Sequence, residues 1–195
     1  MSTDGVIETI AEASPQFRAR MAGVFYLGTF VAGVFALVFG RRLGVFYFYA
    51  ANLIATACYI AVTLLFYELF KPVNTGLSLL AALISLAGLV TGTLSLLHLA
   101  PSPINNLVFF GFYCLLIGYL IFRSTFLPRA LGLLMAFGGL GWLTFLSPAL
   151  AKSLSPYNLF PGILGEGVLT VWLLVFGLNV QRWNEQARAV RPVVV

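Results

Sequence analysis

Residues 45–70 read VFYFYAANLIATACYIAVTLLFYELF, and Lys71-Pro72-Val73-Asn74 follows them. This stretch carries a single charged side chain, Glu68. As an α-helix it would be about 39 Å long at 1.5 Å per residue, which exceeds the roughly 30 Å hydrocarbon core of a bilayer. The proline and asparagine that follow are turn signals. The stretch therefore predicts one membrane-spanning helix that ends at Phe70.

The rest of the chain has the same character. Of its 195 residues, 61% are apolar and 9% are charged, whereas soluble domains average roughly 45–50% apolar and about 25% charged residues. So few charges could not cover the surface of a water-soluble protein of this length. The charges gather at short intervals, and the apolar runs between them approach the roughly 20 residues that cross a bilayer as a helix. We therefore expect one compact helical domain in a lipid bilayer.

Six apolar runs are long enough to cross that bilayer, and together they predict an all-α bundle of six transmembrane helices. The expected spans are 21–40, 45–70, 75–99, 105–124, 129–146 and 158–180, with tails at 1–20 and 181–195. Two prolines in Ala100-Pro101-Ser102-Pro103 separate the third span from the fourth. The N-terminal tail lacks the apolar core of a cleaved signal, so we expect the first span to be an uncleaved anchor.

The basic residues predict how the bundle is oriented. Six spans place both tails on one side of the membrane. That side would hold Arg18, Arg20, Lys71, Arg123, Arg129, Arg182, Arg188 and Arg191, and the other side Arg41, Arg42 and Lys152. Because basic residues favour the cytoplasmic side, we expect both termini to lie in the cytoplasm. We expect the membrane to be the cell (inner) membrane. The pair Arg41-Arg42 is the one signal against this orientation.

The net charge of +5 does not indicate nucleic-acid binding, because the basic residues lie at span ends and in the tails. The turn that holds Arg123 and Arg129, and Arg182 beyond the sixth span, are expected to contact lipid headgroups. The two cysteines, Cys58 and Cys114, both lie inside apolar runs. They predict neither a disulfide framework nor a metal site, and we expect buried free thiols.

Small residues at four-residue spacing indicate close helix packing, since lipid offers little hydrophobic drive for helices to associate. The sets are Ala32, Ala36 and Gly40; Ala51 and Ala55; Gly88 and Gly92; and Gly132 and Ala136. They could pack within one bundle or form the face of a homodimer, and packing within the bundle is the more common use. Aromatic residues near the span ends, such as Tyr47 and Trp183, are typical of interfacial anchors.

One charged residue stands apart from the span ends, Glu166 in Leu164-Gly165-Glu166-Gly167. It lies about eight residues into the sixth span, hence roughly 12 Å below the outer edge. A charged group near the bilayer centre costs about 2.5–3.5 kcal/mol even on lenient insertion scales, so such residues often mark function. Glu166 is expected either to be protonated, with one interhelical hydrogen bond, or to form a ligand or ion site.

Polar side chains at comparable depth would complete such a site if the helices bring them together. They are Asn52, Thr91, Ser95, Asn105, Asn106 and Thr144, with His98 near the end of the third span. Their convergence would form an outward-facing polar pocket with Glu166 at its floor. His98 is expected to bond a loop carbonyl, with a proton relay to Glu166 or ligation of a haem or pigment as lesser alternatives. No other cofactor is expected.

Several short motifs, taken in order, resemble a bacterial membrane family known as domain of unknown function 4386. They are RMAGVFYL (20–27), LFKPVN (69–74), VFFG (108–111), GYL (118–120), RS (123–124), LPRALG (127–132), GEG (165–167) and WLL (172–174). The similarity covers about residues 18–183 and implies a multi-span membrane module with no known catalytic residues. The family pattern has a longer connection than 100–104, so a pocket lid formed there in relatives is expected to be missing here.

The sequence carries no motif of a nucleotide-binding, metalloprotease or serine-hydrolase site. An enzyme is the third possibility, because no nucleophile–base pair can be named, and two other functions come before it. The protein could be an accessory subunit that binds partner helices, lipids or cofactors in a membrane assembly, or a homo-oligomer, as its short loops and small-residue faces suggest. Alternatively, it could be a small transporter or ligand-binding membrane protein that uses Glu166 and the polar pocket.

Overall fold

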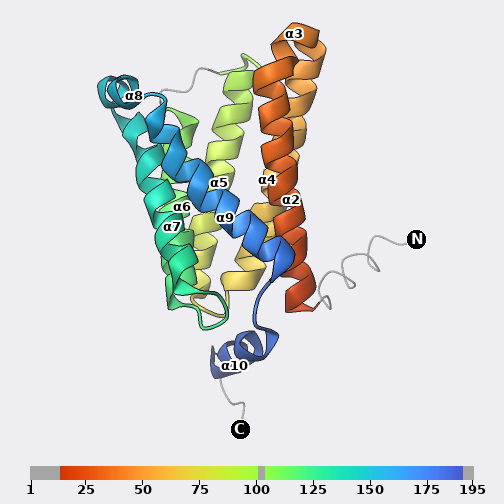
Figure 1. Ribbon diagram of the computed structural model, residues 1–195, viewed down its shortest axis with the longest axis vertical. Coiled ribbons are helices and arrows are strands. Elements are labelled where there is room, and N and C mark those ends of the chain that lie inside the picture. The colour runs from red at the N-terminus through yellow and green to blue at the C-terminus, as the bar shows by residue number, and fades with distance from the viewer. Residues whose placement is uncertain (1–13, 101–103, 191–195) are drawn as a thin grey trace, which may run out of the picture.

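A computed structural model describes residues 14–100 and 104–190 of the chain (Figure 1). These residues contain six long helices, α2 (Pro15–Phe35), α4 (Val45–Phe70), α5 (Thr75–Leu96), α6 (Asn106–Arg123), α7 (Arg129–Leu143) and α9 (Phe160–Val175). A π-helical turn at Ala36–Gly40 extends α2, and a 3₁₀ turn at Thr144–Leu146 extends α7. Six segments are long and apolar enough to cross a membrane, which confirms that prediction.

Side-chain caps fix where several of these helices begin. Ser14 accepts a hydrogen bond from the amide of Phe17, and Pro15 takes the first helical position, where its missing N–H costs nothing. Asn74 and Asn105 cap α5 and α6 in the same way. The first helix therefore starts six residues before the expected boundary at Met21, because the Ser14-Pro15 pair is a helix start signal.

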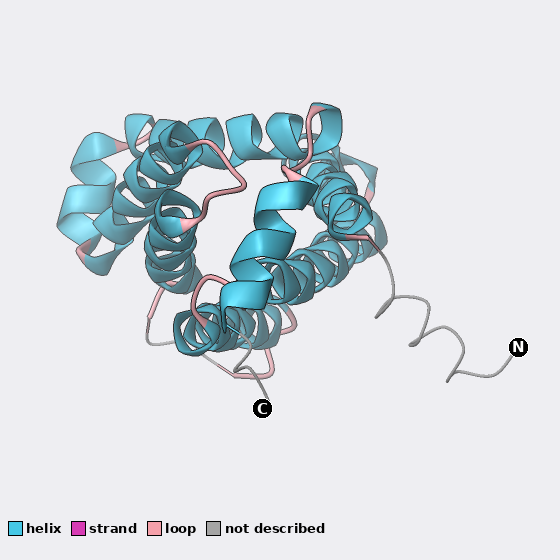
Figure 2. Cartoon of the chain, turned by 90° about the horizontal axis from the view of Figure 1, so that it is seen from below, coloured by secondary structure: helices cyan, strands magenta, loops and turns pink. Residues whose placement is uncertain are grey.

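The six long helices run alternately up and down and close into a ring. Each packs against the helices before and after it in the chain, and α9 closes the circuit by packing against α2. Figure 2 shows the bundle along its length, from the end at which α2 begins and α10 lies. We call this the proximal end, and the opposite end, near α3 (Arg41–Leu43) and α8 (Pro148–Leu154), the distal end (Figure 1).

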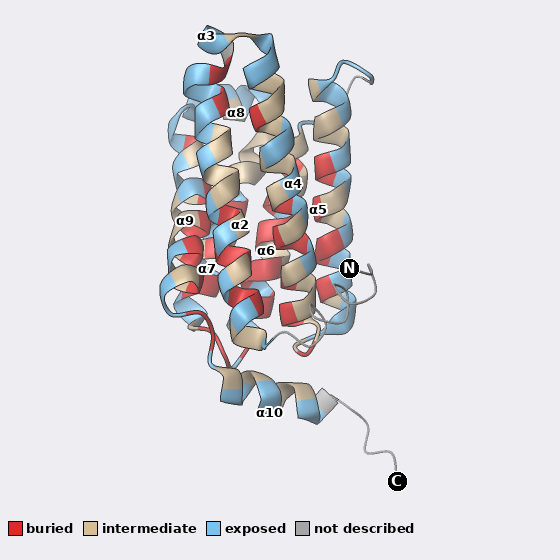
Figure 3. Cartoon of the chain, turned by 90° about the vertical axis from the view of Figure 1, so that its right-hand side faces the viewer, coloured by how far each residue is buried: buried red, intermediate tan, exposed pale blue. Residues whose placement is uncertain are grey.

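Two helices lie where no helix was expected. The short α8 follows Ser147, which caps it, and lies before the last long helix. The helix α10 (Val180–Val190) occupies most of the expected polar tail and lies across the proximal end (Figures 1 and 3). Its apolar Val180 and Trp183, three residues apart, pack against the core of the bundle. A helix was not predicted within this polar tail, because its amphipathic pattern is short and weakly apolar.

The small residues serve packing inside the bundle. A Cβ added to Gly118 would lie 2.7 Å from the carbonyl oxygen of Gly132, and one added to Gly132 would lie 2.6 Å from that of Gly118. Gly88 and Gly92 have the side chains of Phe109 and Asn106 directly against them. These approaches join α6 to α7 and α5 to α6, which favours packing within the bundle over a homodimer face at those positions.

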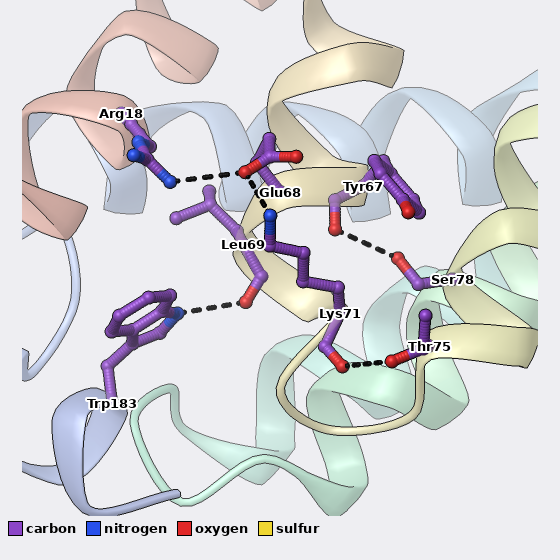
Figure 4. Close-up of polar contacts among 8 residues, drawn as sticks. All are labelled: Arg18, Tyr67, Glu68, Leu69, Lys71, Thr75, Ser78 and Trp183. Atoms are coloured by element: carbon purple, nitrogen blue, oxygen red, sulfur yellow. Dashed lines mark hydrogen bonds and ion pairs between the residues drawn. The ribbon is translucent and has the colours of Figure 1, made fainter. Parts of the chain in front are cut away.

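An ion cluster joins α2 to α4 at the proximal end (Figure 4). The Oε2 atom of Glu68 lies 3.3 Å from Nη1 of Arg18 and 2.6 Å from Nζ of Lys71. The pair with Lys71 joins residues three apart in the chain, whereas the pair with Arg18 links α4 to α2. Beside this cluster, the indole N–H of Trp183 donates a hydrogen bond of 2.9 Å to the carbonyl of Leu69 and ties α10 to the bundle.

Candidate functional site

Glu166 lies inside the ring and accepts hydrogen bonds from three other helices. Its side chain belongs to α9 and is buried. The hydroxyl of Tyr26 on α2 donates to Oε2 at 2.7 Å, and the indole N–H of Trp142 on α7 donates to Oε1 at 2.7 Å. The thiol of Cys114 on α6 lies 3.8 Å from Oε1. The carboxyl group thus receives donors from three helices, where a single interhelical bond was expected.

Two glycines of α9 position Glu166 against α7. The indole ring of Trp142 lies so close to the backbone of Gly162 that any side chain at Gly162 would overlap it. At Gly165 an added Cβ would meet the carbonyl oxygen of Leu134. Helices that lack side chains at their contact can approach closely. This approach brings the Trp142 indole within reach of the carboxyl group.

A second tyrosine connects this carboxyl group to a cavity. The hydroxyl oxygens of Tyr26 and Tyr59 are 3.4 Å apart, and their rings pack edge to face. Tyr59 is also one of the residues that line a cavity of about 390 Å³ between α2, α4, α5 and α6. We call this cavity the distal pocket. Glu166 does not line it, so the carboxyl group is not its floor, as the sequence had suggested, but is reached through two hydroxyl groups.

The distal pocket brings together three of the predicted polar residues, Asn52, Ser95 and Asn106. Other polar contributions come from Thr29, Thr56 and Thr93, and the apolar wall includes Leu89 and Phe110. Asn105, also predicted, lines an adjoining cavity that shares Ser95 and Asn106 with the distal pocket. Ser95 is exposed at the distal end of α5, so the pocket opens at that end of the bundle.

The polar residues of α4 form one stripe on the side that faces the pocket. Asn52, Thr56, Tyr59 and Thr63 follow each other at spacings of four, three and four residues, which places them on one helix face. Thr63 continues the stripe below the pocket, where its hydroxyl lies 2.7 Å from that of Ser85 on α5. This periodicity is a signal in the sequence that could have identified Tyr59.

Three other predicted polar residues are not among those that line the pocket. The hydroxyl of Thr144 bonds the carbonyl of Gly141 and accepts from Asn158, near α8. Thr91 bonds carbonyl oxygens of its own helix. His98 is exposed. The expected convergence therefore includes Asn52, Ser95, Asn105 and Asn106, without Thr91, Thr144 or His98.

His98 ends α5. It has a φ of 57°, its amide bonds the carbonyl of Ser95, and the next amide, Leu99, bonds the carbonyl of Leu94. These two bonds define a Schellman motif, in which the residue at the His98 position adopts the left-handed conformation. Glycine usually takes this position, and histidine is among the residues that tolerate it. The backbone of His98 therefore accounts for its place in the fold.

The basic residues expected at lipid headgroups lie at the proximal end. Arg123 ends α6 and Arg129 begins α7, and both are exposed. The guanidinium of Arg129 lies 5.6 Å from the centre of the Phe122 ring. Arg182, on α10, donates to the carbonyl of Thr125 at 3.3 Å. Arg182 thus helps to hold α10 against the bundle, which the sequence did not indicate.

The described residues contain no group of three or more His, Cys, Asp or Glu side chains that could hold a metal ion. Both cysteines are free in the structure, and Cys114 is buried against Glu166. The partners of Glu166 were missed because nothing in the sequence relates Tyr26, Trp142 and Cys114 to one another. Only the closed ring of helices brings them to the same point.

Comparison with known proteins finds a family model that matches part of the chain and one similar protein. Residues 105–177, which span α6, α7, α8 and α9, match the model of the family described as "Domain of unknown function (DUF4386)". An uncharacterized protein from Archaeoglobus fulgidus is 27% identical over 129 residues, which are 60% of this chain and 76% of that protein. No solved structure matches the chain. The match over residues 105–177 supports the resemblance found in the sequence motifs.

Proposed function

We propose that this protein binds a small polar molecule in the distal pocket, as a small transporter or a receptor-like membrane protein. The observation that carries this proposal is the meeting of Asn52, Ser95 and Asn106, from three different helices, in one cavity of about 390 Å³. Sites for small molecules in proteins are typically about 300–1,000 Å³, with a few placed polar groups among apolar walls. The distal pocket fits that description.

The lining indicates what kind of molecule would fit. Amide groups of Asn52 and Asn106 offer both donors and acceptors, and the hydroxyls of Thr56 and Ser95 do the same. Phe110 adds an aromatic wall, and its ring packs edge to face on Tyr59. No charged side chain lines the pocket among the described residues. A small, uncharged molecule rich in hydroxyl or amide groups is the class we propose.

With both termini in the cytoplasm, as the basic residues suggest, the pocket would face the opposite side of the membrane. On that orientation Arg123 and Arg129 would lie at the cytoplasmic headgroup layer, where we propose that they contact lipid phosphates. The pocket would then take its ligand from the side of the membrane opposite the cytoplasm.

The alternative of an accessory subunit rested on small-residue faces available to partner helices. Most of those faces are occupied within the bundle. Gly40 packs against Phe48, Gly92 against Asn106 and Gly132 against Phe122. A binding role is therefore better supported by the geometry than an assembly role.

A pocket-filling substitution tests the proposal. Ala55 lines the pocket and Leu53, on the same helix, is 41% exposed on the outer surface. Ala55→Phe should fill the pocket, whereas Leu53→Phe should leave it unchanged. Each protein would be purified in detergent, and its thermal stability measured with a library of small neutral polar metabolites.

We expect some compounds to raise the melting temperature of the parent and of Leu53→Phe, and none to raise that of Ala55→Phe, because a ligand stabilises only a protein that can bind it. If no compound stabilises the parent, or if Ala55→Phe responds as the parent does, the distal pocket is not the binding site.

A further inference from the structure

We propose that Tyr59 and Tyr26 form a proton relay between the distal pocket and Glu166, so that the contents of the pocket are linked to the protonation of this carboxyl group. This inference rests on the proposed function for one point only, that the pocket is open to small molecules. It assigns a task to Glu166 and to two tyrosines that the sequence did not single out.

The geometry provides a continuous line of exchangeable hydrogens. Tyr59 is the pocket-lining member, its hydroxyl lies 3.4 Å from that of Tyr26, and the Tyr26 hydroxyl lies 2.7 Å from Oε2 of Glu166. A phenolic hydroxyl both donates and accepts, so it can pass a proton on without keeping a charge. The longer Tyr26–Tyr59 contact is the weaker link of the chain.

The transfer balances without any other group. A proton from the pocket binds to the Tyr59 oxygen as the Tyr59 proton moves to Tyr26 and the Tyr26 proton moves to Oε2. One proton leaves the pocket, one arrives on Glu166, and each tyrosine ends neutral with its donor direction reversed. The return transfer follows the same atoms in the opposite order.

Trp142 makes Oε2 the receiving atom. An indole N–H can only donate, so the 2.7 Å bond from Trp142 keeps Oε1 as an acceptor in both protonation states. The oxygen that faces Tyr26 is the one left to gain or lose a proton. Trp142 is thus a positioning residue, and it reaches the carboxyl group because Gly162 carries no side chain.

The groups that face Glu166 leave its charge free to change. The titratable neighbours are Tyr26 on α2, Tyr59 on α4, and Tyr113 and Cys114 on α6. Within residues 14–100 and 104–190, no lysine or arginine forms an ion pair with Glu166. A buried carboxylate without a cation is poorly stabilised, so protonation is accessible to it.

Protons can enter the proposed relay from the distal pocket but not from the proximal end. Toward the proximal end, Tyr26 packs edge to face on Phe66, and Phe70 stacks on Phe126. All three phenylalanines are buried. These rings offer no exchangeable hydrogen, so protons should reach Glu166 from the distal pocket.

Isotope exchange in D₂O tests the relay without knowledge of the ligand. Infrared spectra of the purified protein in nanodiscs would identify the carbonyl band of protonated Glu166 as the band lost in Glu166→Gln. On transfer to D₂O, the rate of its isotope shift measures how fast protons reach the carboxyl group. Tyr59→Phe and Tyr26→Phe remove the relay hydroxyls while they keep the rings.

Tyr113→Phe is the matched control. Tyr113 is as deeply buried and its ring lies 6.0 Å from that of Tyr59, but its hydroxyl makes no hydrogen bond with another described residue. We expect each relay variant to slow the exchange by about tenfold or more, as for the loss of a positioned proton-transfer group. Tyr113→Phe should exchange at the parental rate.

A plug in the pocket separates this inference from the proposed function. In a Cys58→Ala background, Ser95→Cys would be labelled with a bulky, membrane-impermeant thiol reagent. Labelling that slows the exchange supports an open pocket that feeds Glu166. If Ser95→Cys resists labelling, the proposed function fails.

If labelling slows the exchange but Tyr59→Phe does not, the pocket stands and the relay is wrong. The relay is also wrong if no carbonyl band that depends on Glu166 appears at any pH at which the protein stays folded, or if Tyr113→Phe slows the exchange as much as Tyr59→Phe.

Discussion

The two ends of the bundle are built differently, although the same six helices form both. In the proximal half the helices are in close contact and large side chains such as Phe66, Phe70 and Ile117 are fully buried. In the distal half, α2, α4, α5 and α6 line the distal pocket. Figure 3 shows this contrast, with the buried residues concentrated in the middle and lower parts of the bundle.

The polar residues of the two halves also differ in how they are used. At the proximal end, Arg18 and Glu68 bond across helices. In the distal half, Asn52 donates to the carbonyl of Phe48 and Thr56 to that of Asn52, each within its own helix. Side chains bonded to their own helix do not hold neighbours together. The Arg18–Glu68 pair therefore joins two helices, whereas Asn52 and Thr56 leave the contacts of α4 at these positions to packing.

The largest expected effect is on the close contact between α6 and α7. Gly118→Ala places a Cβ 2.7 Å from the carbonyl oxygen of Gly132 and 2.9 Å from the amide nitrogen of Ala136, and neither backbone atom can move without its helix. We expect a loss of about 3 kcal/mol or more in unfolding free energy, at the upper end of the cost of overpacking. Unfolding by sodium dodecyl sulfate in mixed micelles measures it.

Gly33→Ala is the control for this prediction, because a Cβ at Gly33, in the distal half of α2, has no atom within 4 Å. Alanine replaces glycine in a helix there, so stability should rise by about 0.5–1 kcal/mol. Equal losses for Gly118→Ala and Gly33→Ala would mean that the two halves are not packed differently.

The sequence predicted the distal half less well than the bundle itself. Lengths of apolar runs and breaks such as Lys71-Pro72 identify helices, because the bilayer fixes both the length and the hydrogen bonding of a span. They do not say how the helices pack in space. The ring is closed by the contact of α9 with α2, and these two segments lie far apart in the chain. The apolar runs therefore could not predict it.

Only part of the candidate site was predicted, again because the sequence does not say how the helices pack in space. Depth in the membrane identified Glu166 and Asn106 as unusual, because polarity inside a span is costly. Tyr26 and Trp142 were missed because an aromatic residue inside a span is ordinary, and only the contact with the carboxyl group makes these two special. The left-handed conformation of His98 was not predicted, because residue type does not reveal it.

A smaller effect is expected at the ion cluster of the proximal end. Glu68→Gln removes the charge that Arg18 and Lys71 share, and Arg18, only 9% exposed, then loses its ion pair with Glu68. Because Glu68 itself is partly exposed, solvent screens the interaction, and we expect a loss of about 1 kcal/mol. The loss should shrink at high salt. Salt-dependent unfolding measures both effects.

Lys71→Met is the matched variant for this cluster. Lys71 is half-exposed, and exposed pairs three residues apart on a helix contribute only about 0.2–0.5 kcal/mol. It should therefore cost less than Glu68→Gln. If Lys71→Met and Glu68→Gln cost the same stability, the Glu68–Lys71 pair accounts for the whole loss. The Arg18–Glu68 pair would then contribute nothing to the packing of α2 against α4.

A small effect of opposite sign is expected in the distal half at His98. Its left-handed conformation costs a residue with a side chain about 1–2 kcal/mol, and glycine avoids this cost but loses more chain entropy on folding. His98→Gly should raise stability by less than about 1 kcal/mol, while His98→Ala, which keeps the strain, should not raise it. Thermal unfolding compares the two. If the His98 side chain instead contacts the bound molecule, both variants should abolish the stabilisation by that molecule. If the response to the molecule is unchanged and only His98→Gly gains stability, the role of His98 is to end α5.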